Sequence, residues 1–193
     1  MQDALDRKAT DDSDARAEDD VVLLDDRHAP IGRMPKSTVH HAATPLHLAF
    51  SCYLFDDAGR LMMTRRGLTK LTWPGVWTNS CCGHPRPGEP VEDAVRRRCL
   101  QELGVRIVDL HAVLPEFTYR VQDPSGVWEN EFCPVFVARV HPDDLIRPYE
   151  EEVLEFAWAH WRDVVHSVRA TPFVFSPWAV LQVRQLIGVL GPG

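Results

Sequence analysis

The chain has 193 residues, 45% of them hydrophobic and 25% charged, an ordinary globular balance that excludes wholesale disorder, collagen and coiled coil. Its net charge of −7 argues against general nucleic-acid binding. The sequence has no apolar run approaching the roughly 18 residues that a membrane helix needs, so we expect no membrane partner.

The chain begins with an acidic segment. Residues 1–20 carry eight acidic and three basic side chains, which leaves the rest of the chain with a net charge of only −2. One Leu, one Met and no aromatic residue bury too little to offset the entropy of ordering, so we expect a disordered leader. It lacks the apolar core of a secretory signal, and an odd number of cysteines favours reduced thiols in the cytoplasm. We expect one folded domain over 21–193.

Turn-bounded apolar runs predict most of the strands. The run at 46–55 alternates, with Phe50, Cys52 and Leu54 on one face, and the Asp-Asp-Ala-Gly turn at 56–59 predicts a hairpin. A turn rich in Gly and Pro follows at 83–88. The expected strands cover 21–24, 46–55, 61–66, a short strand within 73–80, 107–114, 116–121, 128–140 and 155–161.

Helix signals are found at three places. Pro90 and Gly104 bracket a helix at about 91–103, and residues 162–169 form a second helical stretch. Ser176 and Pro177 provide an N-cap and a first-turn proline for a last helix that ends near Leu190. Together these elements predict an α+β sandwich with a mixed, mostly antiparallel sheet.

Three histidines and two glutamates form a candidate metal site. Glu129 and Glu131 are two apart on an expected strand, so both carboxylates project from one face. Two adjacent like charges on a buried face need a cation or a basic side chain to neutralise them. Together with His40, His47 and His84 they can encircle one divalent ion. The alternative is a solvated strand edge with scattered polar histidines.

Cys82 is a candidate reactive thiol, because it starts the Cys-Gly-His-Pro sequence at the entrance of a glycine-rich turn. A thiol there can be exposed, and a nearby histidine or metal would favour its ionised form. Cys81 and Cys82 point in opposite directions on a strand, so only one should face a site, and composition does not choose between them. The other three cysteines fit small buried apolar residues.

Basic residues near these segments form a third candidate group, which contains Lys36, Arg66, Lys70 and Arg98. Arg98 and Glu102 are four apart on the expected helix and share a face. The alternative interpretation is a surface ion pair without function, worth about 0.3–0.5 kcal/mol.

A longer pattern resembles the Nudix box. Its members, at the family's spacing, are Gly83, Glu89, Arg97, Cys99, Glu102, Gly104 and Val105. The pattern departs from the box twice, since Arg98 and Gln101 stand where the family has glutamates. Each departure removes a carboxylate that a pyrophosphohydrolase would use to bind metal and activate water.

Three further motifs make the resemblance specific. TNSCCGHP at 78–85, WENEFCPVF at 128–136 and FSPW at 175–178, together with the altered box, resemble the type I isopentenyl-diphosphate isomerase family. The resemblance runs from about Val21 to the last helix. It implies a Nudix-like α/β/α sandwich and the interconversion of isopentenyl and dimethylallyl diphosphate without hydrolysis.

The resemblance also implies the bound ions. The family's metal-binding set corresponds to His40, His47, His84, Glu129 and Glu131, a His3Glu2 site for Mn²⁺, Mg²⁺ or Zn²⁺. A second ion, Mg²⁺ on the substrate diphosphate, would be held by Glu102 and the backbone carbonyl of Cys82.

The remaining implied roles concern catalysis and substrate binding. The family's catalytic residues correspond to Cys82, not Cys81, and to Glu131 and Tyr119. Its diphosphate-binding cations correspond to Lys36, Arg66, Lys70 and Arg98, and Trp178 corresponds to the aromatic residue over the hydrocarbon end.

The implied reaction explains these residue types. An unactivated alkene is isomerised by protonation at one carbon and proton removal at another, through a tertiary carbocation-like state. Cys82 on one side and Glu131 with Tyr119 on the other can supply the two proton-transfer groups. Trp178 can stabilise the cation by about 2 kcal/mol or more. Water would quench the cation, so we expect a closing lid, with residues 36–41 as the candidate.

Two other functions compete with this interpretation. A Nudix-type pyrophosphohydrolase would need the glutamates that this box lacks, and a metal-stabilised binding domain would turn over no isoprenoid diphosphate. We therefore expect a cytoplasmic, monomeric isomerase that acts on a small isoprenoid diphosphate and binds no nucleic acid.

Overall fold

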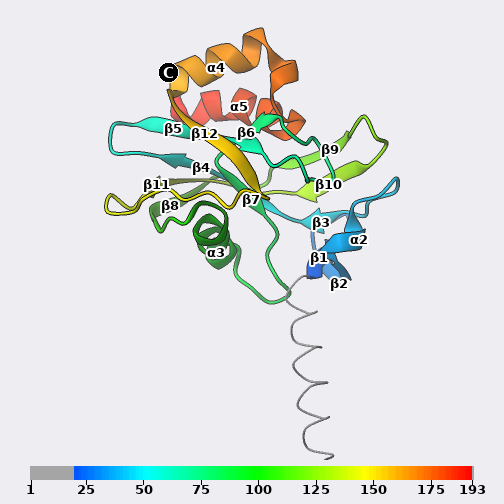
Figure 1. Ribbon diagram of the computed structural model, residues 1–193. Coiled ribbons are helices and arrows are strands. Elements are labelled where there is room, and N and C mark those ends of the chain that lie inside the picture. The colour runs from blue at the N-terminus through cyan, green and yellow to red at the C-terminus, as the bar shows by residue number, and fades with distance from the viewer. Residues whose placement is uncertain (1–19, 193) are drawn as a thin grey trace, which may run out of the picture.

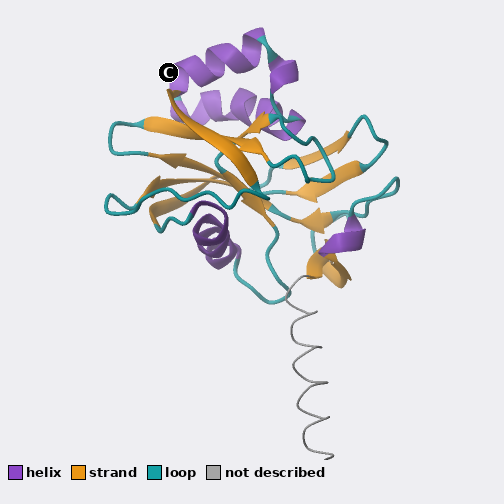
Figure 2. Ribbon diagram, viewed as in Figure 1, coloured by secondary structure: helices purple, strands orange, loops and turns teal. Residues whose placement is uncertain are grey.

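The computed structural model describes residues 20–192. Its strands form two mixed sheets, and helices cover both faces of the larger one (Figures 1 and 2). The smaller sheet has the order β2-β1-β3-β10-β9 and consists of β1 (Asp20–Leu24), β2 (Pro30–Pro35), β3 (His47–Leu48), β9 (Thr118–Gln122) and β10 (Trp128–Phe132).

The larger sheet has the order β12-β5-β4-β11-β8, with β6 paired to β5 and β7 to β4. Its strands are β4 (Phe50–Phe55), β5 (Arg60–Arg66), β6 (Trp77–Thr78), β7 (Cys81–Gly83), β8 (Ile107–Leu114), β11 (Val135–Val140) and β12 (Val153–His160).

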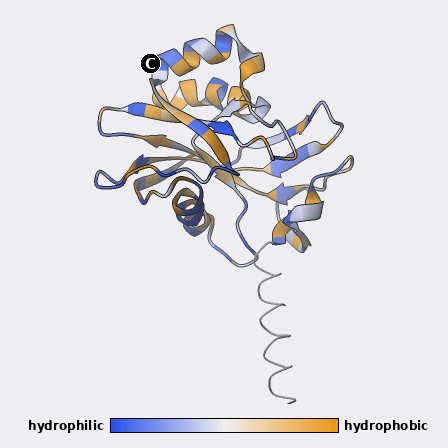
Figure 3. Cartoon of the chain, in the orientation of Figure 1, coloured by the Kyte–Doolittle hydropathy of each residue, from blue (hydrophilic) through white to orange (hydrophobic). Residues whose placement is uncertain are grey.

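The helices divide between the two sides of the larger sheet. They are α2 (Lys36–Val39), α3 (Val91–Leu103), α4 (Trp161–Ala170), the 3-10 turn η1 (Pro172–Val174) and α5 (Pro177–Leu190). Figure 1 shows α3 on one side and α4 with α5 on the other. Figure 3 shows that apolar residues dominate α5, whereas α4 alternates apolar and polar residues. None of the helices within residues 20–192 is long and apolar enough to cross a bilayer.

Both faces of β4, in the middle of the larger sheet, are buried. Phe50 and Leu54 pack toward α3 in a cluster that includes Val95. Tyr53 points to the opposite face and packs in a second cluster with Leu186 of α5. The α/β/α sandwich and the mixed, mostly antiparallel pairing predicted from the sequence are confirmed, with parallel pairs only at β3–β10 and β4–β11 among the described strands.

Two strands that the sequence predicts as continuous are each divided between the two sheets. The run at 46–55 breaks at Ala49 into β3 and β4, and the run at 128–140 breaks at Cys133 and Pro134 into β10 and β11. Pro134 has no N–H with which to continue a ladder. The breaks lie side by side, because the Ala49 N–H donates to the carbonyl of Phe132 at 2.9 Å and the Ser51 N–H to that of Pro134 at 3.1 Å. Alternation alone predicted the strands and missed the division.

The remaining differences are at the ends of elements and in short elements that the sequence analysis did not predict. Helix α3 begins and ends as predicted, whereas β12 begins at Val153 and α4 at Trp161. The sequence analysis missed β2 and α2, since their few residues show no clear period. The predicted acidic leader lies outside the described residues, apart from Asp20 in β1.

Candidate active site

A cavity of about 300 Å³ lies where the two sheets meet, lined by residues of β9 and β10 from one sheet and of β5 and β7 from the other. Helix α3 adds two side chains to its wall, and α5 adds one. The predicted site residues that line it are Lys36, His40, Arg66, Lys70, Cys82, His84, Arg98, Glu102, Tyr119, Glu129, Glu131 and Trp178. His47 is fully buried behind this wall. Residues from 36 to 178 therefore converge on one cavity.

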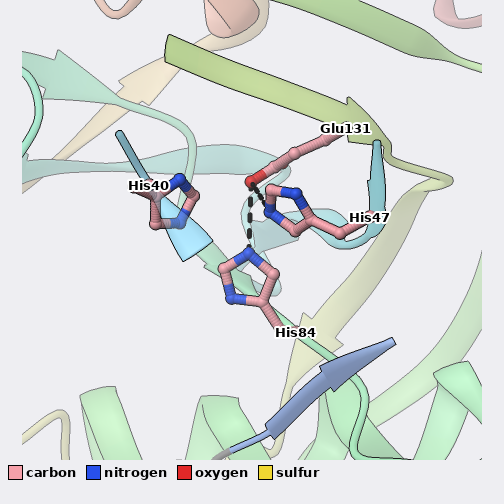
Figure 4. Close-up of side chains that lie close together, drawn as sticks. All are labelled: His40, His47, His84 and Glu131. Atoms are coloured by element: carbon pink, nitrogen blue, oxygen red, sulfur yellow. Dashed lines mark hydrogen bonds and ion pairs between the residues drawn. The ribbon is translucent and has the colours of Figure 1, made fainter. Parts of the chain in front are cut away.

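At one end of the cavity, three histidines surround a glutamate (Figure 4). One nitrogen or oxygen from each of His40, His47, His84 and Glu131 lies within 4.8 Å of the others. We call these four residues the histidine cluster. The strand register produces it, because Glu131 of β10 is paired with His47 of β3 on one side and with Tyr119 of β9 on the other. His40 and His84 follow α2 and β7 directly.

The histidine cluster fits a divalent cation. His47 Nδ1 lies 2.9 Å from the carbonyl oxygen of Pro45, so it carries the proton of a neutral ring. Nε2 then directs its lone pair at Glu131 Oε1, 3.4 Å away, which is favourable only with a proton or a cation between them. Both His47 Nε2 and His40 Nδ1 are buried and have no hydrogen-bond partner among the described residues. Orphaned ring nitrogens around a carboxylate are what a metal site without its ion would show.

The pKa values of the cluster are set by burial and by Glu131. Burial lowers the pKa of His40 to about 4 and that of His84 to about 3, so both rings stay neutral at physiological pH. Burial also lowers the His47 pKa, but the hydrogen bond and charge of Glu131 outweigh it and raise the pKa. Against its own burial, the contacts with His47 and His84 hold the pKa of Glu131 well below its usual range. Neutral imidazoles and an ionised carboxylate are the forms that bind metal.

Glu129 lies beside this cluster rather than within it. Its Oε2 is 3.6 Å from His40 Nδ1, and its Oε1 accepts a hydrogen bond from the Thr72 hydroxyl. Burial and the charge of Glu131 raise the pKa of Glu129 to about 8. Without a cation, Glu129 therefore keeps its proton at neutral pH.

Both Cys81 and Cys82 contribute to the cavity wall, but the Cys81 thiol is directed at α3, where it lies 3.5 Å from Glu102 Oε2. Cys81 and Cys82 belong to opposite faces of β7, and Cys81 packs in the same cluster as Val95 of α3. Cys82 Sγ lies 3.4 Å from Ser51 Oγ and donates to Asn79 Oδ1 at 3.2 Å. The nearby imidazoles are neutral and do not favour an ionised thiol, and burial raises the Cys82 pKa to about 12. Cys82 is therefore a thiol that carries its proton.

Aromatic residues form the wall next to Cys82 and Glu131. The Tyr119 hydroxyl donates to Glu131 Oε2 at 2.8 Å, and burial raises the Tyr119 pKa well above its usual range. The Trp178 ring is buried and lies 5.8 Å from the Tyr119 ring. The Arg66 guanidinium lies 5.0 Å from the Trp178 ring centroid and donates to the carbonyls of Thr72 and Trp73. Arg66 is thus held against the aromatic wall, although the sequence analysis grouped it with the basic residues Lys36, Lys70 and Arg98.

The same cavity also contains Lys36, Lys70 and Arg98, and we call the part formed by these three residues the basic end. Burial lowers the Lys36 pKa, and the charges of Arg98 and Lys70 lower it further. Arg98 is paired with Glu102, and it also lies 3.2 Å from Glu152. The Arg98–Glu102 pair is mostly shielded and faces the cavity, so it is not the exposed surface pair considered above.

Three residues of the site escaped the sequence analysis. Asn79 is fully buried, and its Oδ1 accepts from both Cys82 and Trp178. Thr72 binds Glu129, and Glu152 binds Lys70. Asn79 lies within the TNSCCGHP motif and could have been singled out there. Glu152 is one of three consecutive glutamates, and no local signal separates it from its neighbours.

Comparisons with known proteins identify similar chains. The NUDIX domain family matches residues 45–179. An isopentenyl-diphosphate Delta-isomerase of Kocuria rhizophila is 56% identical over 165 residues, which cover 86% of this chain and 91% of that protein. The enzyme of the same name from Salmonella typhi is 52% identical, with coverage of 86% and 90%.

Solved structures agree on the fold. A Deinococcus radiodurans protein superposes with a TM-score of 0.66 at 18% identity and covers 86% of this chain and 98% of its own. A NUDIX hydrolase from Nitrosomonas europaea gives a TM-score of 0.53 at 16% identity, with coverage of 75% and 89%. At these identities the likeness concerns the fold alone.

Proposed function

The chain belongs to the NUDIX family and, within it, to the isopentenyl-diphosphate Delta-isomerases, and from this premise we propose how its cavity performs the reaction. The enzyme isomerises isopentenyl diphosphate in isoprenoid biosynthesis. The observation that carries the mechanism is that a protonated thiol and an ionised carboxylate, from different sheets, line one cavity. The reaction needs one proton donor and one acceptor beside the alkene, and Cys82 and Glu131 supply that pair.

The altered Nudix box favours isomerisation over hydrolysis. A pyrophosphohydrolase would need carboxylates at positions 98 and 101 to bind metal and activate water. Here Arg98 extends into the cavity and pairs with Glu102, while Gln101 accepts from Arg97. A cation at position 98 binds a diphosphate without adding another metal ion, so the substrate is anchored and its phosphates are not attacked.

We propose that the histidine cluster, with Glu129 beside it, holds a divalent Mn²⁺, Mg²⁺ or Zn²⁺. Bound there, the ion would restrain the Glu131 carboxylate and lower its affinity for a proton. The strand pairing already places this carboxylate between His47 and Tyr119. The Tyr119 hydroxyl donates to Glu131 and, with its high pKa, retains its proton at neutral pH. Glu131 and Tyr119 thus form one proton-transfer unit opposite Cys82.

The basic end is proposed to bind the diphosphate through Lys36, Lys70 and Arg98, with Arg66 between it and the aromatic wall. Glu102 and the backbone carbonyl of Cys82 would hold Mg²⁺ on the phosphates. Arg and Lys are suited to this because phosphate oxygens accept charge-assisted hydrogen bonds from both. The binding energy orients the alkene between the two proton-transfer groups.

Trp178 is proposed to lie beside the hydrocarbon. Its indole N–H donates to Asn79, which fixes the ring, and a ring face can stabilise a developing carbocation. Arg66 already lies over this ring, so one face carries a fixed cation. The hydrocarbon would then meet the edge or the other face.

The compartment and the assembly state are also proposals. All five cysteines are free thiols, which supports a reducing compartment, and we propose the cytoplasm. We further propose a monomer that acts on a small molecule without nucleic acid or membrane.

The test is turnover of isopentenyl diphosphate with Mg²⁺, followed as acid-labile allylic product. The wild type should form dimethylallyl diphosphate without releasing phosphate; phosphate release without isomer would support the hydrolase instead. Cys82→Ser should lose nearly all turnover and stay folded. The matched control, Cys81→Ser, should remain active, because that thiol faces α3. An inactive Cys81→Ser beside an active Cys82→Ser would show that the proposed thiol is the wrong one.

A further inference from the structure

Glu152 is a carboxylate inside the basic end, and the mechanism above gives it no part. It ends the loop before β12 and lines the cavity. Its Oε2 lies 2.5 Å from Lys70 Nζ, and its Oε1 lies 3.2 Å from Arg98 Nη2. One carboxylate therefore spans two of the three cations that are proposed to bind the diphosphate.

The backbone of Glu152 is held in place. Its N–H donates to the Tyr149 carbonyl at 2.9 Å, and its carbonyl accepts from the Gly67 N–H at 2.9 Å. A Cβ added at Gly67 would lie only 2.1 Å from the neighbouring carbonyl oxygen of Glu151, so the two loops approach closely because residue 67 is a glycine. This approach brings Lys70, three residues further on, to the carboxylate.

The charge of Glu152 is opposite to that of the three cations of the basic end. Lys36, Lys70 and Arg98 are mutually repulsive, and the carboxylate relieves that repulsion. Burial alone would raise the Glu152 pKa, but the charges of Lys70 and Arg98 lower it to about 2, so it is ionised throughout the physiological range. Arg98 nevertheless keeps a buried Nε without a hydrogen-bond partner in the described chain. Glu152 therefore offsets part of the positive charge of the basic end, but it does not use all the hydrogen-bond donors of Arg98.

A carboxylate and a phosphate group compete for the same donors, because both accept charge-assisted hydrogen bonds from Lys and Arg. We propose that Glu152 is a resident counter-ion that the diphosphate must displace from Lys70 and Arg98, and that it thereby limits the affinity for substrate and product. The ligand in this inference is the diphosphate of the proposed function. A ligand with several negative charges forms contacts with the cations that offset the loss of the Glu152 contacts, whereas a monoanion gains little binding free energy. Glu152 therefore also selects for diphosphates.

The experiment is calorimetric titration of the full-length protein with inorganic pyrophosphate in the presence of Mg²⁺. Removing the competing charge in Glu152→Gln should tighten pyrophosphate binding about tenfold, as expected for the loss of one partly buried ion-pair partner. In turnover assays, the KM for isopentenyl diphosphate should fall while kcat does not rise. Glu152→Asp, whose shorter carboxylate cannot span both cations, should tighten binding by a smaller factor and serves if Glu152→Gln fails to fold.

Glu155→Gln is the matched control. Glu155 lies 2.7 Å from Arg65 on the exposed side of β12, outside the cavity, and its loss changes the net charge by the same amount. It should bind pyrophosphate like the wild type. Unchanged or weaker pyrophosphate binding by the Glu152 variants would overturn the proposal, as would an equal gain in Glu155→Gln. Absence of isomer formation by the wild type would refute the proposed function, while the pyrophosphate titration would still decide the role of Glu152.

Discussion

The histidine cluster and the basic end both contain charged groups in the cavity, but they differ in whether those charges already have partners. The histidine cluster comes from paired strands and from residues directly beside an element, and three of its ring nitrogens have no hydrogen-bond partner in the described chain. The basic end comes from a loop, a short helix and α3, and two of its cations, Lys70 and Arg98, are already paired with Glu102 and Glu152. The histidine cluster lacks a cation to balance Glu131, while the basic end contains carboxylates that balance its cations.

This difference indicates two modes of binding. Buried polar atoms without partners cost free energy, so an ion that satisfies them binds to a preformed site and stabilises the fold. At the basic end, a ligand must replace contacts that already exist, so binding there is an exchange with a small net gain. We therefore expect resident binding of metal and reversible binding of diphosphate.

The largest effect should come from Glu131→Gln. This change removes the charge proposed to bind metal and the group proposed to exchange a proton, so turnover should fall by roughly three orders of magnitude or more. Allylic product formation measures it, and circular dichroism checks that the variant is folded. Turnover close to that of the wild type would contradict the assignment of Glu131 and make the histidine cluster a structural feature.

Metal removal should affect only the histidine cluster. At metal concentrations about a hundred times Kd, a bound ion contributes about 2.7 kcal/mol. Dialysis against EDTA should therefore lower Tm by roughly 5–10 °C. His84→Ala should lose most of this shift, whereas Lys70→Gln should retain it. An equal loss in both variants would show that the two ends are not independent.

Substitution of Lys70 tests the role of the basic end in substrate binding. Lys70→Gln should raise the KM for isopentenyl diphosphate about tenfold, because one charge-assisted contact is lost, and should change kcat much less. Steady-state kinetics at several substrate concentrations separate the two parameters. A fall in kcat with constant KM would instead place Lys70 in the chemical step.

The smallest effect is the pH dependence of the ion pairs of Glu152. Its pKa is lowered to about 2 in the folded protein, so its stabilisation is fully present above the unfolded value near 4.5 and is lost as the pH falls toward 2. After discounting for partial exposure, we expect Glu152→Gln to lose about 1 kcal/mol at pH 7 and less at pH 3, measured by urea unfolding. The same loss at both pH values would show that charge is not the cause.

Local sequence patterns predicted much of the fold, but not where the strands divide. The period of two at 46–55 indicates a strand in either sheet, and it carries no mark of the change at Ala49. That change depends on pairing with β10 and β11, more than 80 residues away. Helix α3, in contrast, is bounded by its own Pro90 and Gly104, and its range was predicted correctly.

The site shows the same limit. Cys82, His84 and Glu131 were predicted because they occur in short motifs whose residue types suit metal binding and proton transfer, and the family resemblance supported His40 and His47. Asn79 was missed although it lies within one of these motifs, and Glu152 was missed because its partners are remote in the sequence. Glu152 and Lys70 are separated by 82 positions, and Glu152 has glutamates on its N-terminal side that the sequence does not distinguish from it.

The family, the order of most elements and a proposed chemistry for the site could be predicted from the amino-acid sequence, because motif spacing and periodicity are local properties. The protonated form of Cys82, the contact of Arg66 with Trp178 and the position of Glu152 at the basic end became visible in the folded chain. Each of these depends on burial or on contacts between distant segments, which arise when the two sheets pack and cannot be deduced from neighbours along the chain.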